Sequence, residues 1–286
     1  MDPHLPNQAA LDRVVVVLVA TRNSLNIGAA ARAMSNFGFP HLRLVRPWDP
    51  SFQEAKDAER SAVGAGDLLA RAVVFPSVAE AVADCTLVMG TTAVTAGGRR
   101  DLLHPLDGLE ASAELVQAHL QNGESRVAIL FGSEKTGLSN DDLSHCHRLL
   151  RIPTREEHIS MNLGQAVAIC LYELGAARTL RLRSGQAPNR AARGPADITA
   201  VDAASHPVPA SADEPALALS AEIERLTVMI LEALQASGYI APGAEKATEE
   251  KLRRLFRRFA LTRQDAQLAL GMARQVLWKL RPPLSR

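Results

Sequence analysis

The fold of this chain is decided near its N-terminus by residues 14–34, which read VVVVLVATRNSLNIGAAARAM. The run from Val14 to Val19 is almost entirely β-branched, which is typical of a strand that helices cover on both faces. After a short polar turn, apolar residues recur at helical spacing from Ile27 to Met34 and form a narrow face of small side chains. A buried strand followed directly by such a helix predicts an α/β fold.

The same alternation of short apolar runs and Ala-rich helical patterns continues along the first part of the chain. The predicted strands are residues 14–19, 42–45, 72–75, 86–89, 127–131 and 149–152. This order predicts a largely parallel sheet with residues 14–19 and 127–131 at its centre. Because ligands bind at the carboxyl ends of such strands, we expect the functional site after these two.

The chain has 286 residues, which is enough for two domains. Residues 183–215 are rich in Ala, Pro, Gly and Ser and show no periodicity, so they are predicted to be a flexible linker. The linker would join an α/β domain over residues 1–182 to a small all-helical domain over residues 216–286. Helices are predicted at residues 217–235, 246–259 and 263–280, the last with Thr262 as its N-cap.

Composition excludes several classes of protein. Hydrophobic residues are 47% and charged residues 22%, as in globular chains, and the net charge is only +1, so an anionic partner requires a local basic patch. No apolar run reaches the roughly 20 residues of a membrane span, so we expect no membrane partner. Three cysteines without a C-x-x-C pair fit reduced thiols in a cytoplasm, and His145–His147 have no second ligand pair for a metal.

A glycine-containing loop follows the strand at 127–131. Gly132 and Gly137 have the spacing of a phosphate-binding loop, but Leu138 stands where that motif requires lysine, which argues against a nucleotide triphosphate. The two glycines indicate either close approach of the backbone to a ligand or simply a tight turn. Ser139 with Asp142 resembles a capping box that starts the next helix.

Two further segments carry polar residues at predicted helix starts. Asn26 can cap the first helix, and Arg32 lies off its apolar face, so the segment is either functional or a plain capped helix with a surface arginine. Ser160 and Asn162 can cap a later helix, and Gly164 indicates close packing there.

Taken together, these three segments resemble the SPOUT superfamily of RNA methyltransferases, and more closely its branch of bacterial tRNA ribose methyltransferases. The first motif is similar to Asn26-Ile27-Gly28 through Arg32-Ala33-Met34. The second is similar to Phe131-Gly132-Ser133-Glu134 with Gly137-Leu138, and the third to Ile152-Pro153 with residues 160–163. Residues 251–256 also resemble the helical domain that this branch appends.

The resemblance implies a SPOUT-type sheet with a C-terminal trefoil knot, S-adenosylmethionine as cofactor, tRNA as substrate, and a homodimer whose site draws on both subunits. The implied reaction is methylation of the ribose 2'-hydroxyl of cytidine or uridine at position 32 of the anticodon loop. The alternatives are a methyltransferase of the same fold that acts on ribosomal RNA or on another tRNA site, and a catalytically silent RNA-binding protein.

The resemblance also implies roles for individual residues. The catalytic set is Arg32, Asn26, Glu134, Ser160 and Asn162, and the cofactor set is Thr91, Thr92, Ala93, Gly132, Ile152, Ser160 and Met161. Because an arginine guanidinium is not ordinarily deprotonated, Arg32 suits a phosphate clamp better than a general base. His158 is a candidate proton acceptor, or else an ordinary exposed loop histidine.

A basic amphipathic helix is predicted in the C-terminal part. Leu252, Leu255, Phe256 and Phe259 fall on one side, which leaves a cationic side that is a predicted RNA-binding footprint or a solvated helix face. The cationic residues are Lys251, Arg253, Arg254, Arg257 and Arg258.

Overall fold

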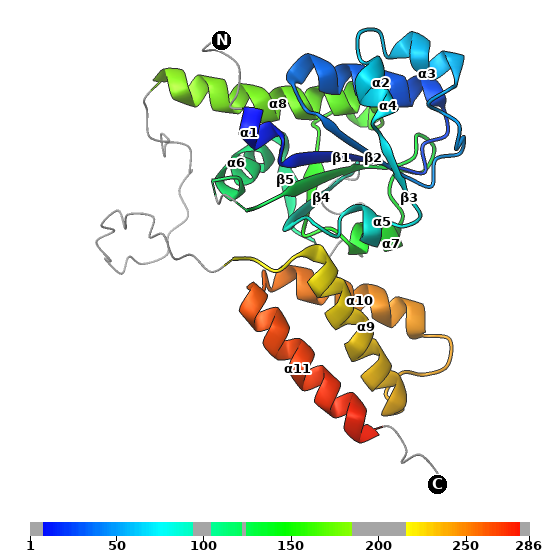
Figure 1. The fold of residues 1–286 in the computed structure, drawn as a ribbon, viewed down its shortest axis with the longest axis vertical. Coiled ribbons are helices and arrows are strands. Elements are labelled where there is room, and N and C mark those ends of the chain that lie inside the picture. The colour runs from blue at the N-terminus through cyan, green and yellow to red at the C-terminus, as the bar shows by residue number, and fades with distance from the viewer. Residues whose placement is uncertain (1–7, 94–103, 122–123, 185–215, 281–286) are drawn as a thin grey trace.

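The computed structural model describes residues 8–93, 104–121, 124–184 and 216–280 (Figure 1). Its sheet has the strand order β3-β2-β1-β6-β4-β7-β5, and every neighbouring pair is parallel. The strands are β1 (Val14–Val19), β2 (His41–Val45), β3 (Val73–Phe75), β4 (Leu87–Thr91), β5 (Leu106–Gly108), β6 (Val127–Phe131) and β7 (Arg148–Arg151). The predicted parallel α/β sheet is therefore confirmed, with β1 and β6 side by side near its centre.

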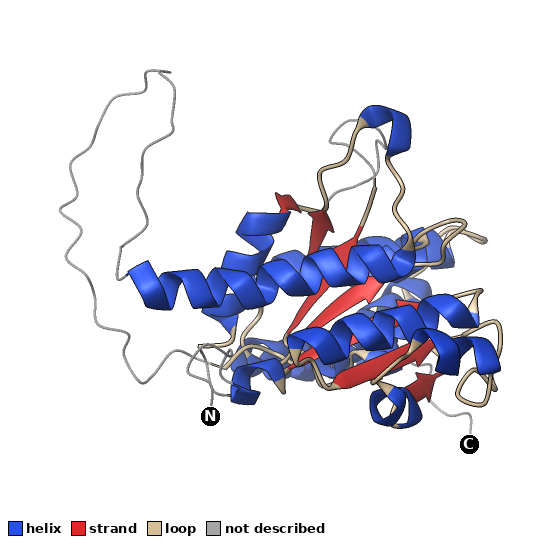
Figure 2. Cartoon of the chain, turned by 90° about the horizontal axis from the view of Figure 1, so that it is seen from above, coloured by secondary structure: helices blue, strands red, loops and turns tan. Residues whose placement is uncertain are grey.

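Helices cover both faces of this sheet (Figure 2). In the α/β part they are α1 (Gln8–Leu11), α2 (Ser24–Phe37), α3 (Lys56–Ser61), α4 (Gly66–Ala70), α5 (Val78–Ala81), α6 (Leu109–His119), α7 (Asn140–Ser144), the 3-10 turn η1 (Glu156–His158) and α8 (Leu163–Ser184). The C-terminal part contains α9 (Ser220–Ala236), α10 (Glu245–Arg258) and α11 (Arg263–Leu280). Among the helices so described, none is long and apolar enough to cross a membrane.

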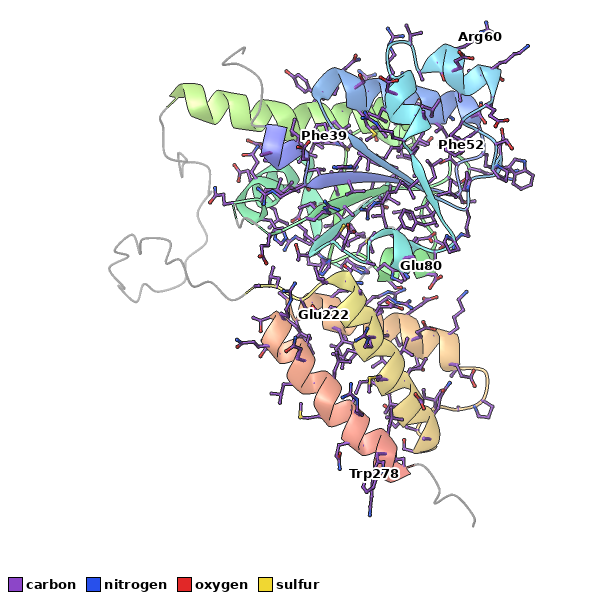
Figure 3. All side chains as sticks on the ribbon, in the orientation of Figure 1. Phe39, Phe52, Arg60, Glu80, Glu222 and Trp278 are labelled. Carbon is purple, nitrogen blue, oxygen red and sulfur yellow. The ribbon has the colours of Figure 1, made fainter. Side chains whose placement is uncertain are left out.

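Strand β1 shows why the early sequence decides the fold. Val14, Val16 and Leu18 join a core with α2, α6 and α8, whereas Val15 and Val17 join a second core with α5 and α7. In Figure 3 the side chains of Phe39 and Phe52 lie in the first of these layers. A strand buried on both faces needs the near-continuous apolar run that the sequence shows.

Strand β5 was not predicted from the sequence. β5 pairs with β7 at the edge of the sheet, but it has only three residues, of which Asp107 and Gly108 are not strand formers. An ion pair between Arg148 and Asp107 holds it against β7. The pairing is therefore a tertiary contact rather than a local preference.

Two glycines let helix α2 approach its neighbours closely. A Cβ atom on Gly28 would lie 2.1 Å from the carbonyl oxygen of Ala58 in α3, and one on Gly164 would lie 2.7 Å from the Cβ of Ala29. The close packing predicted at Gly164 is confirmed, and it joins α8 to α2 just beyond the third motif segment.

The three C-terminal helices form a bundle that packs against the underside of the α/β domain (Figure 1). The backbone N–H groups of Ser220 and Ala221, at the start of α9, donate to the carbonyl oxygens of Cys85 and Ala83. Thr262 caps α11 as predicted, with its Oγ1 accepting from the N–H of Asp265 at 3.1 Å. The trefoil knot and the domain boundaries stay predictions, and residues 185–215 of the predicted linker lie outside the described residues.

The prediction that all five cationic residues of α10 lie on an exposed face is wrong for Arg253 and Arg257. Arg253 and Arg257 are 3% and 2% exposed, because α10 packs on α9 and on α7 at once. Arg253 bonds both oxygens of Glu224 at 2.8 Å and reaches Ser144 of α7 at 2.8 Å. Arg253 therefore joins the two parts of the chain, whereas Arg257 donates to Ser220 Oγ at 2.6 Å within the bundle, and neither is available to RNA phosphates. Arg254 pairs with Glu250 at 3.1 Å, so Lys251 and Arg258 remain as the exposed members of the predicted cationic set.

Replacing Arg253 with methionine should destabilise the docked C-terminal bundle by about 3–5 kcal/mol, because it leaves the carboxylate of Glu224 partly buried without its main partner. The measurement is urea unfolding followed by circular dichroism. The matched control is Arg225→Met on the exposed side of α9, for which we expect a change below about 0.5 kcal/mol. Equal effects of the two substitutions would contradict a structural role for Arg253.

Buried histidines at the same interface predict a pH dependence. Burial and then the charges of Arg253 and Arg257 lower the pKa of His145 to about 2, so His145 is neutral in the folded protein. Its pKa in the unfolded chain is about 6.5, so below that pH the unfolded state binds the extra proton and the folded state loses stability. When the pH falls from 7.5 to 5.5, protonation of His145 in the unfolded chain should lower the free energy of unfolding by about 1.4 kcal/mol.

Urea unfolding of wild type and His145→Asn at the two pH values measures this effect. The variant should lose about 1.4 kcal/mol less than wild type on acidification. An identical pH dependence in wild type and His145→Asn would refute the assignment.

Candidate active site

A cavity of about 380 Å³ opens at the carboxyl ends of β4, β6 and β7. It is within the size range of pockets for small organic ligands. All seven predicted cofactor residues line it, namely Thr91, Thr92, Ala93, Gly132, Ile152, Ser160 and Met161. The structure thus brings together three loops that are far apart in the sequence. The cavity lies after β6, as expected, but no residue of the segment directly after β1 lines it.

The walls of the cavity combine two kinds of surface. Leu138, Leu150 and Ile152 provide an apolar wall, while the hydroxyls of Thr91, Thr92 and Ser160 and the backbone of the loop after β6 provide polar groups. Such a donor set fits a flat heteroaromatic ring together with a polar chain, as in S-adenosylmethionine. No cluster of side chains able to bind a metal occurs within the described residues.

The loop after β6 is shaped by its glycines. The N–H of Gly137, which has a φ of +68°, donates back to the carbonyl oxygen of Ser133 at 2.8 Å and closes a tight turn. A Cβ on Gly132 would lie 2.1 Å from the carbonyl carbon of Gly137, so no larger residue fits there without moving the backbone. The capping box of Ser139 and Asp142 is confirmed and fixes the end of the loop to α7.

Glu134 organises the polar residues at the edge of this cavity. Its Oε2 accepts from the backbone N–H of Arg22 at 2.9 Å, and its Oε1 accepts from the N–H of Asn23 at 3.2 Å and from Nδ2 of Asn26 at 2.8 Å. Asn26 Oδ1 in turn accepts from Nδ2 of Asn162 at 2.9 Å. We call Glu134, Asn26 and Asn162 the polar cluster; it joins the three motif segments.

These hydrogen bonds define what Glu134 can do. Burial by itself would raise the pKa of Glu134, but the donors from Asn26, Arg22 and Asn23 outweigh burial and lower it. Glu134 is therefore ionised at neutral pH, and its oxygens are already engaged. It is suited to position the segment after β1 rather than to accept a proton from substrate.

The helix caps differ in part from those predicted. Asn23, not Asn26, is the N-cap of α2, and its side chain accepts from the N–H of Leu25. Asn26 lies in the first turn, which frees its amide for the polar cluster. Asn162 does accept from the N–H of Gln165 at the start of α8, whereas Ser160 lines the cavity instead.

Arg32 and His158 lie outside the cavity of their own chain. Arg32 is exposed on α2, six residues beyond Asn26, and neither joins the polar cluster nor lines the cavity. His158 is exposed at the end of η1, whereas the next residues, Ile159 and Ser160, line the cavity. The structure therefore unites four of the five predicted catalytic residues around one opening and leaves Arg32 apart.

The sequence did not reveal two residues that position Glu134. Arg22 and Asn23 hold Glu134 through backbone N–H groups, which no side-chain motif reveals. The one available signal was the capping ability of Asn23, which fixes where α2 begins and so turns these amides toward Glu134.

A parallel sheet with a small-molecule cavity at the carboxyl ends of its central strands defines an α/β cofactor-binding enzyme domain. The model of the SpoU rRNA methylase family matches residues 13–172, more than half of the chain, and the chain belongs to this family of methyltransferases. The predicted SPOUT membership is thereby confirmed.

Relatives extend the similarity beyond that domain. The chain is 31% identical to the tRNA (cytidine/uridine-2'-O-)-methyltransferase TrmJ of Pectobacterium atrosepticum, over 93% of this chain and 97% of the relative. It is 32% identical to the TrmJ of Sodalis glossinidius, over 92% and 90%. The crystal structure of TrmJ from Z. mobilis ZM4 aligns with a TM-score of 0.71 at 28% identity, over 92% of this chain and 98% of that one.

Proposed function

We propose that this protein is an S-adenosylmethionine-dependent tRNA 2'-O-ribose methyltransferase. The observation that carries the proposal is the convergence of three motif segments, up to 136 residues apart, on one cavity and one polar cluster. Similarity to the two TrmJ relatives over nine-tenths of the chain supports tRNA as the substrate and the ribose of cytidine or uridine as the target.

S-adenosylmethionine supplies an electrophilic methyl group when it is bound. The residues around the cavity hold the cofactor through backbone and hydroxyl groups, and the apolar wall excludes water from it. Glu134 fixes the start of α2 through three hydrogen bonds, and Asn162 ties α8 to the same point. This arrangement makes a rigid opening in which a ribose can be aligned with the methyl donor.

The 2'-hydroxyl must lose its proton as its oxygen forms the new bond to the methyl carbon, while the bond from that carbon to sulfur breaks and S-adenosylhomocysteine would leave with the electron pair. Arg32 is not suited to accept this proton, because an arginine guanidinium stays protonated in proteins and has no free acceptor. Its planar fork can hold a backbone phosphate in a two-point contact, and that phosphate or solvent can then take the proton. In this proposal Arg32 is the residue that orients the ribose.

We propose a homodimer because Arg32 does not line the cavity of its own chain. In a dimer, Arg32 of one subunit would complete the cavity of the other. The exposed position of Arg32 on α2, clear of the polar cluster, supports this arrangement.

We also propose a cytoplasmic location. The cysteines at positions 85, 146 and 170 are free and buried, which supports a reducing compartment.

The function is tested by incubating the protein with S-adenosylmethionine and unmodified tRNA and mapping methylated nucleosides by mass spectrometry. We expect 2'-O-methylated cytidine or uridine; position 32 of the anticodon loop stays a prediction that the map decides. A tRNA with a deoxynucleotide at the mapped position should not be methylated, since the 2'-hydroxyl is the acceptor. Methylation of a base instead would refute the proposal.

A second candidate function is methylation of ribosomal RNA, which the description of the matching family favours. Presenting ribosomal RNA and tRNA at equal concentration distinguishes the two substrates, and a faster rate on ribosomal RNA would favour this alternative. A catalytically silent RNA-binding protein is less well supported, because the polar cluster and the cavity are both intact.

The C-terminal bundle is proposed to contribute to tRNA binding through Lys251 and Arg258, the two exposed members of the predicted cationic set on α10. Replacing both with alanine should weaken binding and reduce the slope of log K against log salt by about one for each phosphate that is no longer neutralised. Filter binding between about 50 and 200 mM salt measures this, with unchanged S-adenosylmethionine affinity as the control. An unchanged slope would place the RNA footprint elsewhere.

A further inference from the structure

We propose that Trp48 and Arg22 form a stacking platform for the base of an unpaired RNA nucleotide next to the target ribose. The inference rests on the proposed function, which it deepens by naming a contact to the substrate. Trp48 lies outside the three motif segments.

Trp48 is an exposed aromatic residue that is held in place. It is 73% exposed, one of only two tryptophans in the chain, and lies in the loop after β2. Its backbone N–H donates to the carbonyl oxygen of Thr21 at 2.9 Å, and the carboxylate of neighbouring Asp49 accepts from Ser24 Oγ at 3.2 Å. A large apolar ring kept at the surface on an anchored loop is a candidate for contact with a partner.

Arg22 couples this ring to the candidate active site. Its guanidinium carbon lies 5.1 Å from the centre of the Trp48 ring, at cation–π distance. The backbone N–H of the same residue donates to Glu134 at 2.9 Å. Arg22 therefore joins the platform directly to the polar cluster, and we assign the platform to a nucleotide that adjoins the target.

The surroundings favour a base over a phosphate. Beside Arg22 is a hollow lined by Asp49 and Asp57 together with Lys56, so negative charge accompanies the positive charge there. Arg22 and Lys56 are balanced by the two carboxylates, so the hollow has no excess positive charge to attract a phosphate, whereas a neutral base needs none. Tryptophan and arginine both present flat faces on which a base can stack.

Stacking of this kind requires a base that is not paired in a helix. Proteins read unpaired loop nucleotides by stacking them on aromatic rings and guanidinium groups, whereas bases within duplex RNA are not accessible. We therefore assign the platform to a loop nucleotide that is displaced from its own stack when the target ribose enters the site.

The test uses tryptophan fluorescence of the full chain. Trp278→Phe leaves Trp48 as the only tryptophan, and Trp48→Phe leaves Trp278, which is 69% exposed at the far end of α11 (Figure 3). Saturation with unmodified tRNA should quench Trp48 and protect it from acrylamide, and duplex RNA of equal length should do neither. The Trp278 reporter supplies the matched signal of an exposed tryptophan remote from the platform.

Kinetics give the second readout. Trp48→Ala should raise the KM for tRNA by about 10- to 100-fold, the usual worth of one stacked base, and Trp48→Tyr should recover most of it. Affinity for S-adenosylmethionine should not change in either variant. An unchanged KM in Trp48→Ala, or Trp48 emission and acrylamide access that saturating tRNA leaves unaltered, would overturn the platform.

The two proposals fail in different ways. If wild type methylates tRNA while Trp48 stays unaffected by it, the platform is wrong and the proposed function stands. If Trp48 is quenched and protected but no ribose is methylated, the RNA contact stands and the proposed function is wrong.

Discussion

Replacing Arg32 with alanine is expected to lower kcat for tRNA methylation by at least about 100-fold while leaving S-adenosylmethionine affinity within about two-fold of wild type. Loss of one positioned donor at a reaction centre commonly has an effect of this size. Cofactor affinity should be spared because Arg32 does not line the cavity. Single-turnover methylation and calorimetric titration of the cofactor measure the two quantities.

Arg32→Lys is the informative companion variant. A lysine keeps the charge but loses the two-point fork, so it should also lose most of the activity. A lysine variant with nearly wild-type kcat would reduce Arg32 to a generic positive charge.

Mixed dimers test whether Arg32 acts on its own cavity or on that of the partner. One inactive variant is Arg32→Ala; the other is Ser160→Trp, which fills the cavity. If the site is shared, a heterodimer of the two has one intact site and should show about half of wild-type activity per dimer. If Arg32 acts within its own chain, the heterodimer should be inactive.

The second large effect is expected at Gly132. Gly132→Ala should weaken S-adenosylmethionine binding by about 10- to 100-fold, because its Cβ would lie 2.1 Å from the backbone of Gly137 and the loop must move. Calorimetric titration of the cofactor measures this. The matched control is Gly66→Ala in α4, where nothing lies within 4 Å of the added Cβ.

A cofactor affinity in Gly132→Ala equal to that of Gly66→Ala would show that the loop after β6 does not shape the cofactor site. Far-ultraviolet circular dichroism of both variants separates a local movement of the loop from loss of the fold, since only the latter reduces the helical signal.

The sequence by itself determined the α/β class, the position of most strands and the location of the site. Val14–Val19 and Val127–Phe131 could be assigned to the centre of the sheet because burial on both faces leaves a purely local apolar pattern. Of the loops that line the cavity, only the one after β6 followed from this assignment; the residues after β4 and β7 were implied by the resemblance to the SPOUT superfamily. The three C-terminal helices and the cap at Thr262 were predicted on the same local basis.

Only the tertiary structure decided which polar groups meet. Glu134 and Asn26 are 108 residues apart, and two of the donors to Glu134 are backbone amides, so no periodicity could pair them. The short strand β5 likewise depends on β7 as its partner.

The tertiary structure also decided which arginines of α10 are buried. An amphipathic pattern assumes one buried face, but α10 packs on two neighbours, which buries Arg253 and Arg257 while Phe259 is 57% exposed. A buried arginine at position 253 is stable there because Glu224 and Ser144 from other helices satisfy it. Charge partners that lie on other elements are a property of the folded arrangement, and the sequence of one helix does not contain them.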